Sequence, residues 1–90
     1  MLKRFHIFVY GHVQGVFFRA FARKCAMLLN IKGWARNLHD GRVEIMAEGR
    51  EHDLKEFVAK IRVGPDAASV DDVESEEEAF KNEFSSFEII

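Results

Sequence analysis

Apolar and polar residues alternate near the start of the chain, and this spacing predicts a β-strand from Lys3 to Tyr10. The odd-numbered side chains from Phe5 to Val9 share one face, and Phe8 and Tyr10 lie on the other. Apolar residues on both faces are typical of a strand in the middle of a sheet. We therefore expect this strand to be buried on one face and partly covered on the other.

The spacing becomes helical after Val16. Apolar residues then recur three and four positions apart, at Phe18, Phe21, Ala22, Cys25, Ala26, Leu28 and Leu29. This pattern predicts a helix from about Phe17 to Leu29, with Arg23 and Lys24 off its apolar face. Asn30 can adopt the left-handed conformation that ends many helices.

A strand and a hairpin follow this helix. Ile31 to Asn37 is predicted as a second strand, and Leu38 to Gly41 as a turn, because Asp-Gly tolerates the positive φ angles of tight hairpins. Apolar and polar residues alternate again from Arg42 to Glu48, which predicts a third strand.

The second half of the chain predicts another helix and two more strands. Apolar residues from Leu54 to Ile61 have helical spacing, and Gly64-Pro65 ends this helix. Ala68 to Glu74 is predicted as a fourth strand and Phe87 to Ile90 as a short fifth. The acidic run from Asp71 to Glu78 is most simply the solvated edge of the sheet, where like charges discourage association.

The order of these elements is βαββαβ with a short extra C-terminal strand, which is the split, ferredoxin-like arrangement of the α+β class. It predicts a sandwich of a mostly antiparallel sheet with two helices on one face. If both crossovers are right-handed, the third strand lies antiparallel between the first two. Gly11 to Val16, Asn37 and Arg19 then meet at one edge. No internal repeat or linker divides the chain, so residues 1–90 are predicted to form one domain.

Composition and charge narrow the function. The chain has 90 residues, 48% hydrophobic and 31% charged, as an ordinary globular domain does. A formal net charge of −2 gives no general attraction to nucleic acid or membranes. Any anion site must therefore depend on local geometry.

The single cysteine, Cys25, excludes an internal disulfide and suits a reducing cytoplasm. Its place on the apolar face of the first helix favours a buried structural thiol. The first residues lack the long apolar core of a signal peptide or membrane span, so we expect a cytoplasmic protein. The four histidines have no metal-ligand spacing, and we expect neither a metal nor another cofactor. They are His6, His12, His39 and His52.

A glycine-containing loop, Gly11 to Val16, ends the first strand and opens the first helix. Such a loop leaves several N–H groups without partners, and its glycines suit a close approach of the backbone to a ligand. Arg19 adds a guanidinium that matches a phosphate or carboxylate. Asn37 could hold a water molecule. The alternatives are a tight turn with a surface arginine and an asparagine that only starts a turn.

Two stretches of the chain resemble the signatures of the acylphosphatase family. They are Val9 to Arg19 (VYGHVQGVFFR) and Gly33 to Gly49 (GWARNLHDGRVEIMAEG), and the closing FSSFEI fits the same family. The resemblance covers nearly the full length and implies a small, stand-alone, ferredoxin-like enzyme. Such an enzyme hydrolyses acyl phosphates to a carboxylate and inorganic phosphate without a metal or a covalent intermediate.

The resemblance also assigns roles to residues of this chain. Arg19 is then the phosphate-binding arginine, and Asn37 orients the attacking water. The backbone forms the phosphate cradle at His12, Val13, Gln14, Gly15 and Val16. Phe17 and His39 occupy positions that vary in the family, and Asn30 replaces a frequent glycine. We see no dedicated acyl pocket in the sequence, so we expect small acyl phosphates as substrates. We also expect a monomer.

Two further interpretations remain open from the sequence. The RNA-recognition motif shares the βαββαβ order, but its third strand carries aromatic residues and Arg42 to Glu48 has none. We therefore expect no nucleic-acid partner and assign the nine phenylalanines to the core. The other alternative is a non-catalytic anion-binding or regulatory module of the same fold. The presence of both Arg19 and Asn37 favours the enzyme.

Overall fold

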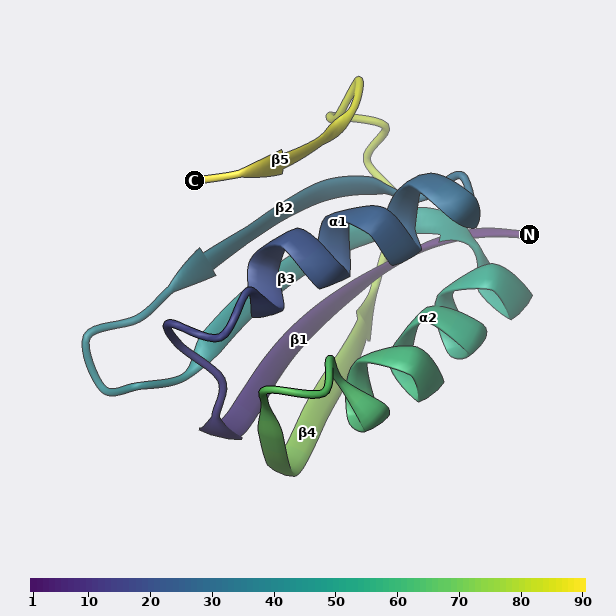
Figure 1. Cartoon of the computed structure of the whole chain (residues 1–90). Helices are drawn as coiled ribbons and strands as arrows, with labels where there is room; N and C mark the ends of the chain where they lie inside the picture. The colour runs from purple at the N-terminus through teal and green to yellow at the C-terminus, as the bar shows by residue number, and fades with distance from the viewer.

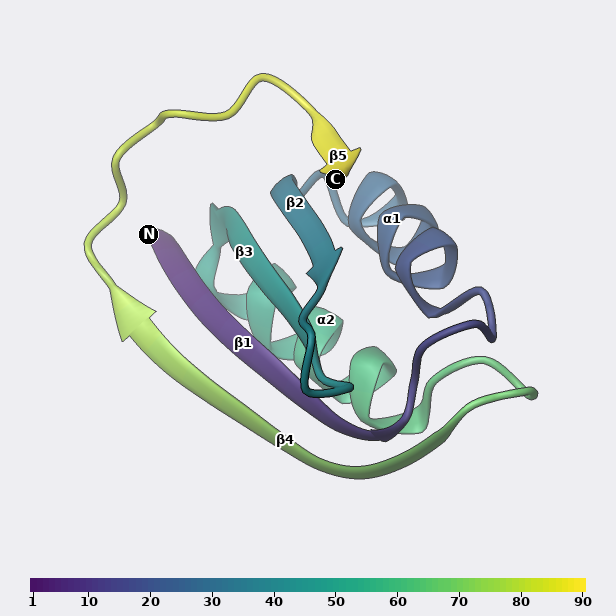
Figure 2. The same ribbon diagram turned by 90° about the vertical axis from the view of Figure 1, so that its left-hand side faces the viewer.

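Five strands form one sheet, and two helices pack on one of its faces (Figures 1 and 2). The computed structural model describes all 90 residues. The elements are β1 (Leu2–His12), α1 (Phe18–Leu28), β2 (Lys32–Asn37), β3 (Val43–Arg50), α2 (Glu51–Val63), β4 (Ser69–Glu78) and β5 (Phe87–Ile89). The order across the sheet is β4-β1-β3-β2-β5.

This topology confirms the predicted ferredoxin-like α+β fold. β3 lies between β1 and β2 and is antiparallel to both, so β1 and β2 run in the same direction. β4 pairs antiparallel with β1, and β5 pairs parallel with β2. The loops that follow β1 and β2 therefore lie at the same end of the sheet, as both views show (Figures 1 and 2).

The core lies between the helices and the covered face of the sheet. The odd-numbered side chains of β1 from Phe5 to Val9 are buried there, while Phe8 and Tyr10 on the other face are half-buried. This agrees with a central strand covered on one side. The helices contribute the buried residues Phe18, Ala22, Cys25, Ala26, Leu54, Phe57, Val58 and Ile61.

Helix α1 is one residue shorter at each end than its apolar pattern predicts. Phe17 precedes the helix in the left-handed conformation, with φ 64°, which non-glycine residues seldom adopt. Leu28, predicted on the apolar face, is 73% exposed. Successive helix residues are about 100° apart, so Leu28 points away when its neighbour Leu29 packs on the core. Asn30 has the expected left-handed φ of 57°.

Neither helix is long and apolar enough to cross a membrane. Cys25 lies on the buried face of α1, and burial raises the pKa of its thiol above the ordinary value. A thiol that stays protonated is a poor nucleophile. The structure therefore agrees with a packing role for Cys25.

Strand β4 is the solvated edge that the acidic run predicts, but it is longer than expected. It extends to Glu78 rather than Glu74, so the whole run from Asp71 belongs to the strand. It pairs with β1 alone, and most of its side chains are exposed. Strand β2 begins at Lys32 instead of Ile31, and β3 continues to Arg50.

Gly11 allows β1 and β4 to approach each other closely at this edge of the sheet. This corrects the expectation that Gly11 approaches a ligand. The pairing of β1 with β4 shifts register between Tyr10 and Gly11, where φ is 127°. A Cβ atom at Gly11 would lie 2.2 Å from the carbonyl oxygen of Ser69. Gly11 is thus required by the close approach of two strands.

Gly11→Ala is expected to lower the free energy of unfolding by about 3 kcal/mol, because the backbone of β4 would have to move. Gly15→Ala is the control, since its φ is also positive but no atom lies within 4 Å of the new Cβ. Strain alone should cost that variant about 1 kcal/mol. Urea unfolding followed by circular dichroism measures both, and equal losses would contradict the assigned contact with Ser69.

The open face of the sheet carries a buried carboxylate at its centre. Glu44 of β3 is hydrogen-bonded to His6 Nε2 of β1 and to Arg36 Nε of β2, each at 2.6 Å. Burial would raise the pKa of Glu44, but these hydrogen bonds outweigh it and hold the pKa below its ordinary value. Glu44 is therefore an ionised group that ties the three central strands together.

A second carboxylate fixes the segment 79–86, which joins β4 to β5. Glu48 accepts hydrogen bonds from the backbone N–H groups of Lys81 (2.8 Å) and Glu83 (3.2 Å). It also pairs with the buried Arg4 at 3.6 Å. The segment passes from one edge of the sheet to the other (Figure 2). It thereby places β5 beside β2 and near α1.

Candidate functional site

The loop Val13–Phe17, which joins β1 to α1, is anchored in the core but open at its middle. The side chains of Val13 and Val16 are buried. Between them Gly15 has φ 75°, and a Cβ atom there would meet nothing within 4 Å. The left-handed Phe17 then turns the chain into the helix. The backbone around Gly15 is therefore accessible to a ligand.

The backbone N–H groups of residues 13–17 donate no hydrogen bond within the chain. They lead directly into the first turn of α1, where N–H groups also lack intrahelical acceptors. The aligned peptide dipoles make this end of the helix positive. A run of free N–H groups at a helix N-terminus is suited to binding an oxyanion.

The side chain of Gln14 joins this loop to the β2–β3 connection. Its Nε2 donates to the carbonyl oxygens of Leu38 at 2.7 Å and Arg42 at 2.9 Å. The Gln14 side chain therefore holds the loop against the β2–β3 connection, and only its backbone is left to contact a ligand. Because Asn37 immediately precedes Leu38, these bonds also set the position of Asn37 relative to the loop.

A pocket of about 310 Å³ lies beside the loop and collects groups from four parts of the chain. Its lining residues are Val13, Gly15, Phe17, Phe18, Arg19, Ala20, Asn37 and Ile89. Arg19 and Asn37, which the sequence singled out separately, thus face the same pocket as Gly15. The last strand, β5, supplies Ile89 and closes one side.

The Arg19 guanidinium is available to a ligand in this pocket. Its only hydrogen bond within the chain runs from Nη1 to the oxygen of Ile90, at 3.3 Å. It forms no ion pair with a carboxylate. An arginine carries five N–H donors, so most of them are free.

The Asn37 side chain is also available to a ligand, because Asp40 and Arg42 hold the turn that follows it. The Arg42 N–H donates to Asp40 Oδ1 at 3.1 Å, and the Arg42 side chain donates to Oδ2 at 2.8 Å. These bonds hold the pKa of Asp40 below its usual range. The Asn37 side chain forms no hydrogen bond within the chain, so the turn does not use it as a simple turn starter would.

The predicted cradle residues His12, Gln14 and Val16 do not line the pocket, and neither does His39. His12 is exposed at the end of β1, opposite Ser69, so the bent loop begins one residue later, at Val13. His39 is an exposed residue of the β2–β3 connection. No three histidine, cysteine, aspartate or glutamate side chains are grouped so that they could hold a metal ion.

Sequence reasoning missed three contributors to this site. The residue pattern places Phe17 in the helix and Ile89 in a strand without function, and the family resemblance uses Gln14 through its backbone alone. Ile89 reaches the pocket because β5 lies beside β2, a pairing that no local pattern specifies. The left-handed conformation of Phe17 has no residue signal either, since glycine or asparagine usually marks it.

Comparison with known proteins agrees with this geometry. The protein-family model described as acylphosphatase matches residues 5–89, which is nearly the whole chain. The chain belongs to the acylphosphatase family. Among curated acylphosphatases, that of Syntrophus aciditrophicus is 44% identical over 90 residues, covering 100% of this chain and 94% of the relative.

Solved acylphosphatase structures share the fold over its full extent. The crystal structure of the Bacillus subtilis acylphosphatase superposes with a TM-score of 0.94 at 39% identity, covering 100% of this chain and 99% of the other. The Coxiella burnetii acylphosphatase gives a TM-score of 0.93 at 36% identity, covering 99% and 93%. The chain is thus an enzyme of the acylphosphatase type.

Proposed function

We propose that this enzyme hydrolyses acyl phosphates to a carboxylate and inorganic phosphate in the pocket beside the loop Val13–Phe17. One observation carries the proposal: a single pocket is bordered by the loop with free N–H groups, by the Arg19 guanidinium, which forms no ion pair, and by the free amide of Asn37. Membership of the acylphosphatase family supports this choice of reaction.

The phosphoryl group would occupy the cradle formed by the backbone from His12, the last residue of β1, to Val16. The N–H groups and the dipole of α1 stabilise its oxygens. Arg19 adds a planar fork that can hold two of those oxygens at once. Because Val13 and Val16 are buried, the cradle is held in place before the substrate arrives.

Asn37 would hold the attacking water in line with the bond from phosphorus to the acyl oxygen. As the water oxygen bonds to phosphorus, that bond breaks and the carboxylate leaves with its electron pair. A carboxylate has a pKa of about 4 and needs no general acid to leave. No acidic or histidine side chain lines the pocket, so the water's proton passes to an oxygen of the substrate's own phosphate.

The proposal relies on positioning and charge stabilisation. Fixed donors aimed at a transferring phosphoryl group supply most of the rate in such reactions. All groups of the proposed site belong to one chain, so a monomer with no cofactor suffices for the proposed reaction. The cytoplasmic location expected from the sequence stays a prediction. On the open face of the sheet, Glu44 and Glu48 of β3 pair with Arg36 and Arg4, so these arginines are not free to bind a nucleic-acid backbone.

The test is hydrolysis of benzoyl phosphate by the purified chain in excess chelator. We expect turnover that the chelator does not reduce and that Arg19→Ala and Asn37→Ala each lower by at least about 10²-fold, with both variants shown to be folded by circular dichroism. A folded wild type that binds inorganic phosphate but shows no turnover would contradict the proposal. It would instead support the alternative of a non-catalytic anion-binding module.

A further inference from the structure

Exposed hydrophobic side chains gather around α1 and the proposed site. Eight large hydrophobic residues of the chain are exposed, and four of them line the site pocket or the groove next to it. These four are Phe17 (81% exposed), Met27 (66%), Leu28 (73%) and Ile89 (39%). Single exposed apolar residues are ordinary, but a contiguous group marks a binding surface.

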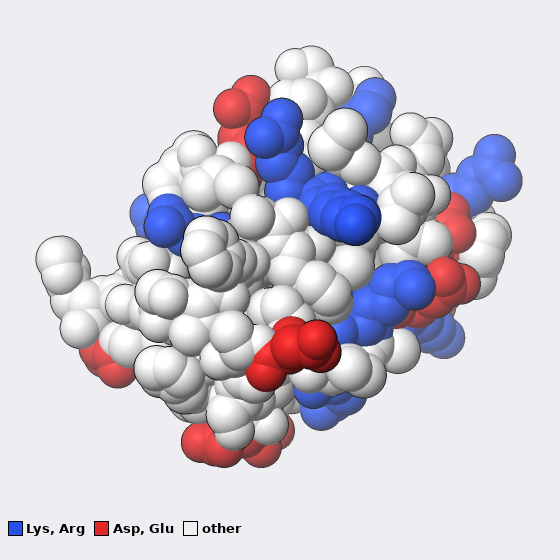
Figure 3. Space-filling view, in the orientation of Figure 1, with Lys and Arg blue, Asp and Glu red and all other residues white.

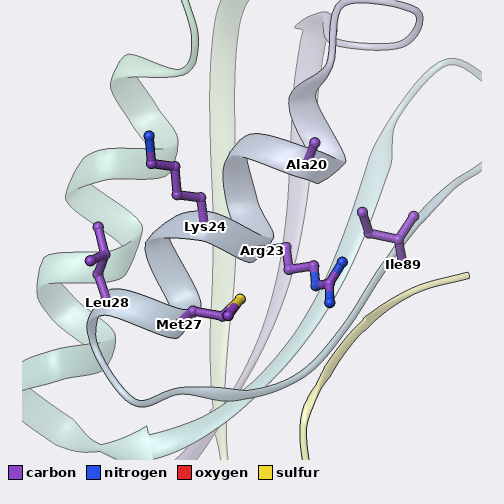
Figure 4. A pocket seen from close by; sticks show the side chains of 6 residues that line it. All are labelled: Ala20, Arg23, Lys24, Met27, Leu28 and Ile89. Atoms are coloured by element: carbon purple, nitrogen blue, oxygen red, sulfur yellow. The ribbon is translucent and has the colours of Figure 1, made fainter.

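A groove of about 630 Å³ runs along the outer face of α1 beside β5. Figure 4 shows its lining residues, Ala20, Arg23, Lys24, Met27, Leu28 and Ile89. Ala20 and Ile89 also line the pocket that holds Arg19 and Asn37. The groove therefore adjoins the proposed phosphate site and extends away from it along the helix.

The two cations of this groove are not used elsewhere in the fold. Arg23 extends from α1 toward Ile89, whereas Lys24 and Leu28 flank the other side (Figure 4). Neither Arg23 nor Lys24 forms an ion pair within the chain. Basic side chains lie beside uncharged surface on this face (Figure 3). Their aliphatic stems can cover an apolar ligand while the charged ends stay in water.

We propose that the groove binds the aliphatic body of the acyl group, so that the enzyme prefers longer acyl phosphates to acetyl phosphate. This inference rests on the proposed function, because it requires the phosphoryl group in the adjoining pocket. The acyl chain would leave that pocket between Ala20 and Ile89 and lie against Met27 and Leu28. The sequence predicts no acyl pocket, and the proposed groove corrects this prediction. The sequence misses the groove because Ile89 lines it only through the pairing of β5 with β2.

The dimensions of the groove suit a chain of medium length. From Ala20 to Leu28 the helix rises about 12 Å, enough for a chain of hexanoyl size to lie along it. Burying one methylene group completely is worth about fourfold in binding. An open groove covers about half of that surface, so each methylene should contribute about twofold. These contacts are the same before and during the reaction, so KM should fall while kcat stays constant.

The test compares kcat and KM for acetyl, butyryl and hexanoyl phosphate. Their carboxylate leaving groups have similar basicity, so differences in kcat/KM report binding of the chain. We expect kcat/KM to rise about 16-fold from acetyl to hexanoyl phosphate, through KM, because hexanoyl has four more methylene groups. Equal values for all three substrates would overturn the groove and leave the proposed function intact. A folded protein that hydrolyses none of them would overturn the proposed function itself.

A double substitution tests where the acyl chain of the substrate lies. Met27→Gln with Leu28→Gln keeps good helix formers of similar size and removes the apolar surface. In this double variant the hexanoyl-to-acetyl ratio should fall close to one. The control is Val63→Gln, which changes a 79%-exposed residue at the end of α2 and should keep the wild-type ratio. An unchanged hexanoyl-to-acetyl ratio of kcat/KM in the double variant would show that the acyl chain does not lie in this groove and would overturn the inference.

Discussion

Arg19→Lys should reduce kcat/KM for benzoyl phosphate by about 10³-fold, or about 4 kcal/mol of transition-state stabilisation. Lysine keeps the charge but loses the planar fork that can hold two phosphate oxygens in fixed geometry. Arg19 is half-buried and has no ion-pair partner, so the substitution breaks no structural salt bridge. The loss should therefore appear in function and not in folding.

Phosphate binding tests the role of Arg19 directly. Isothermal titration with inorganic phosphate should show weaker binding in Arg19→Lys than in the wild type. Arg50→Lys is a matched control, because Arg50 is an exposed arginine that ends β3 and immediately precedes α2, away from the pocket lining. If phosphate binds Arg19→Lys and the wild type equally well, Arg19 does not hold the phosphoryl group.

Asn37→Ala should lower kcat by about 10²–10³-fold, as the loss of one preorganised donor typically does. The affinity for inorganic phosphate should stay close to that of the wild type, since Asn37 is assigned to the water and not to the phosphoryl oxygens. The Asn37 side chain forms no hydrogen bond in the fold, so its removal should also leave thermal stability unchanged.

His39→Ala provides the control for Asn37, because it shortens an exposed side chain in the same β2–β3 connection without touching the pocket. It should keep wild-type turnover. Full activity in a folded Asn37→Ala variant would exclude the water-positioning role. A large drop in phosphate affinity would instead assign Asn37 to the phosphoryl group.

Most of the fold is predictable because periodicity reports which face of each element is buried. The alternation from Lys3 to Tyr10 and the helical spacing of Leu54 to Ile61 identify β1 and α2 directly. The acidic run from Asp71 identifies the edge β4, because a row of like charges is tolerated where water reaches the side chains. The errors concern boundaries and Leu28, where one residue of rotation separates core from solvent.

The sequence predicts a site residue only where that type of residue has a single plausible role at its position. Arg19 and Asn37 follow a strand-to-helix loop and a strand end, and topology brings such positions together. Gly11 shows the limit of this reasoning, since glycine serves strand contact and ligand contact alike. Ile89 depends on which edge β5 joins, and that choice arises from tertiary packing.

The bonds made by Gln14 have a consequence for how the sequence can diverge. Its amide contacts the carbonyl oxygens of Leu38 and Arg42, which every amino acid at those positions would present. The spacing between the loop and Asn37 is thus independent of the side chains in the intervening connection. Neutral drift at His39 and its neighbours is therefore permitted, whereas Gln14 should be replaced far less freely than its distance from the reacting atoms suggests.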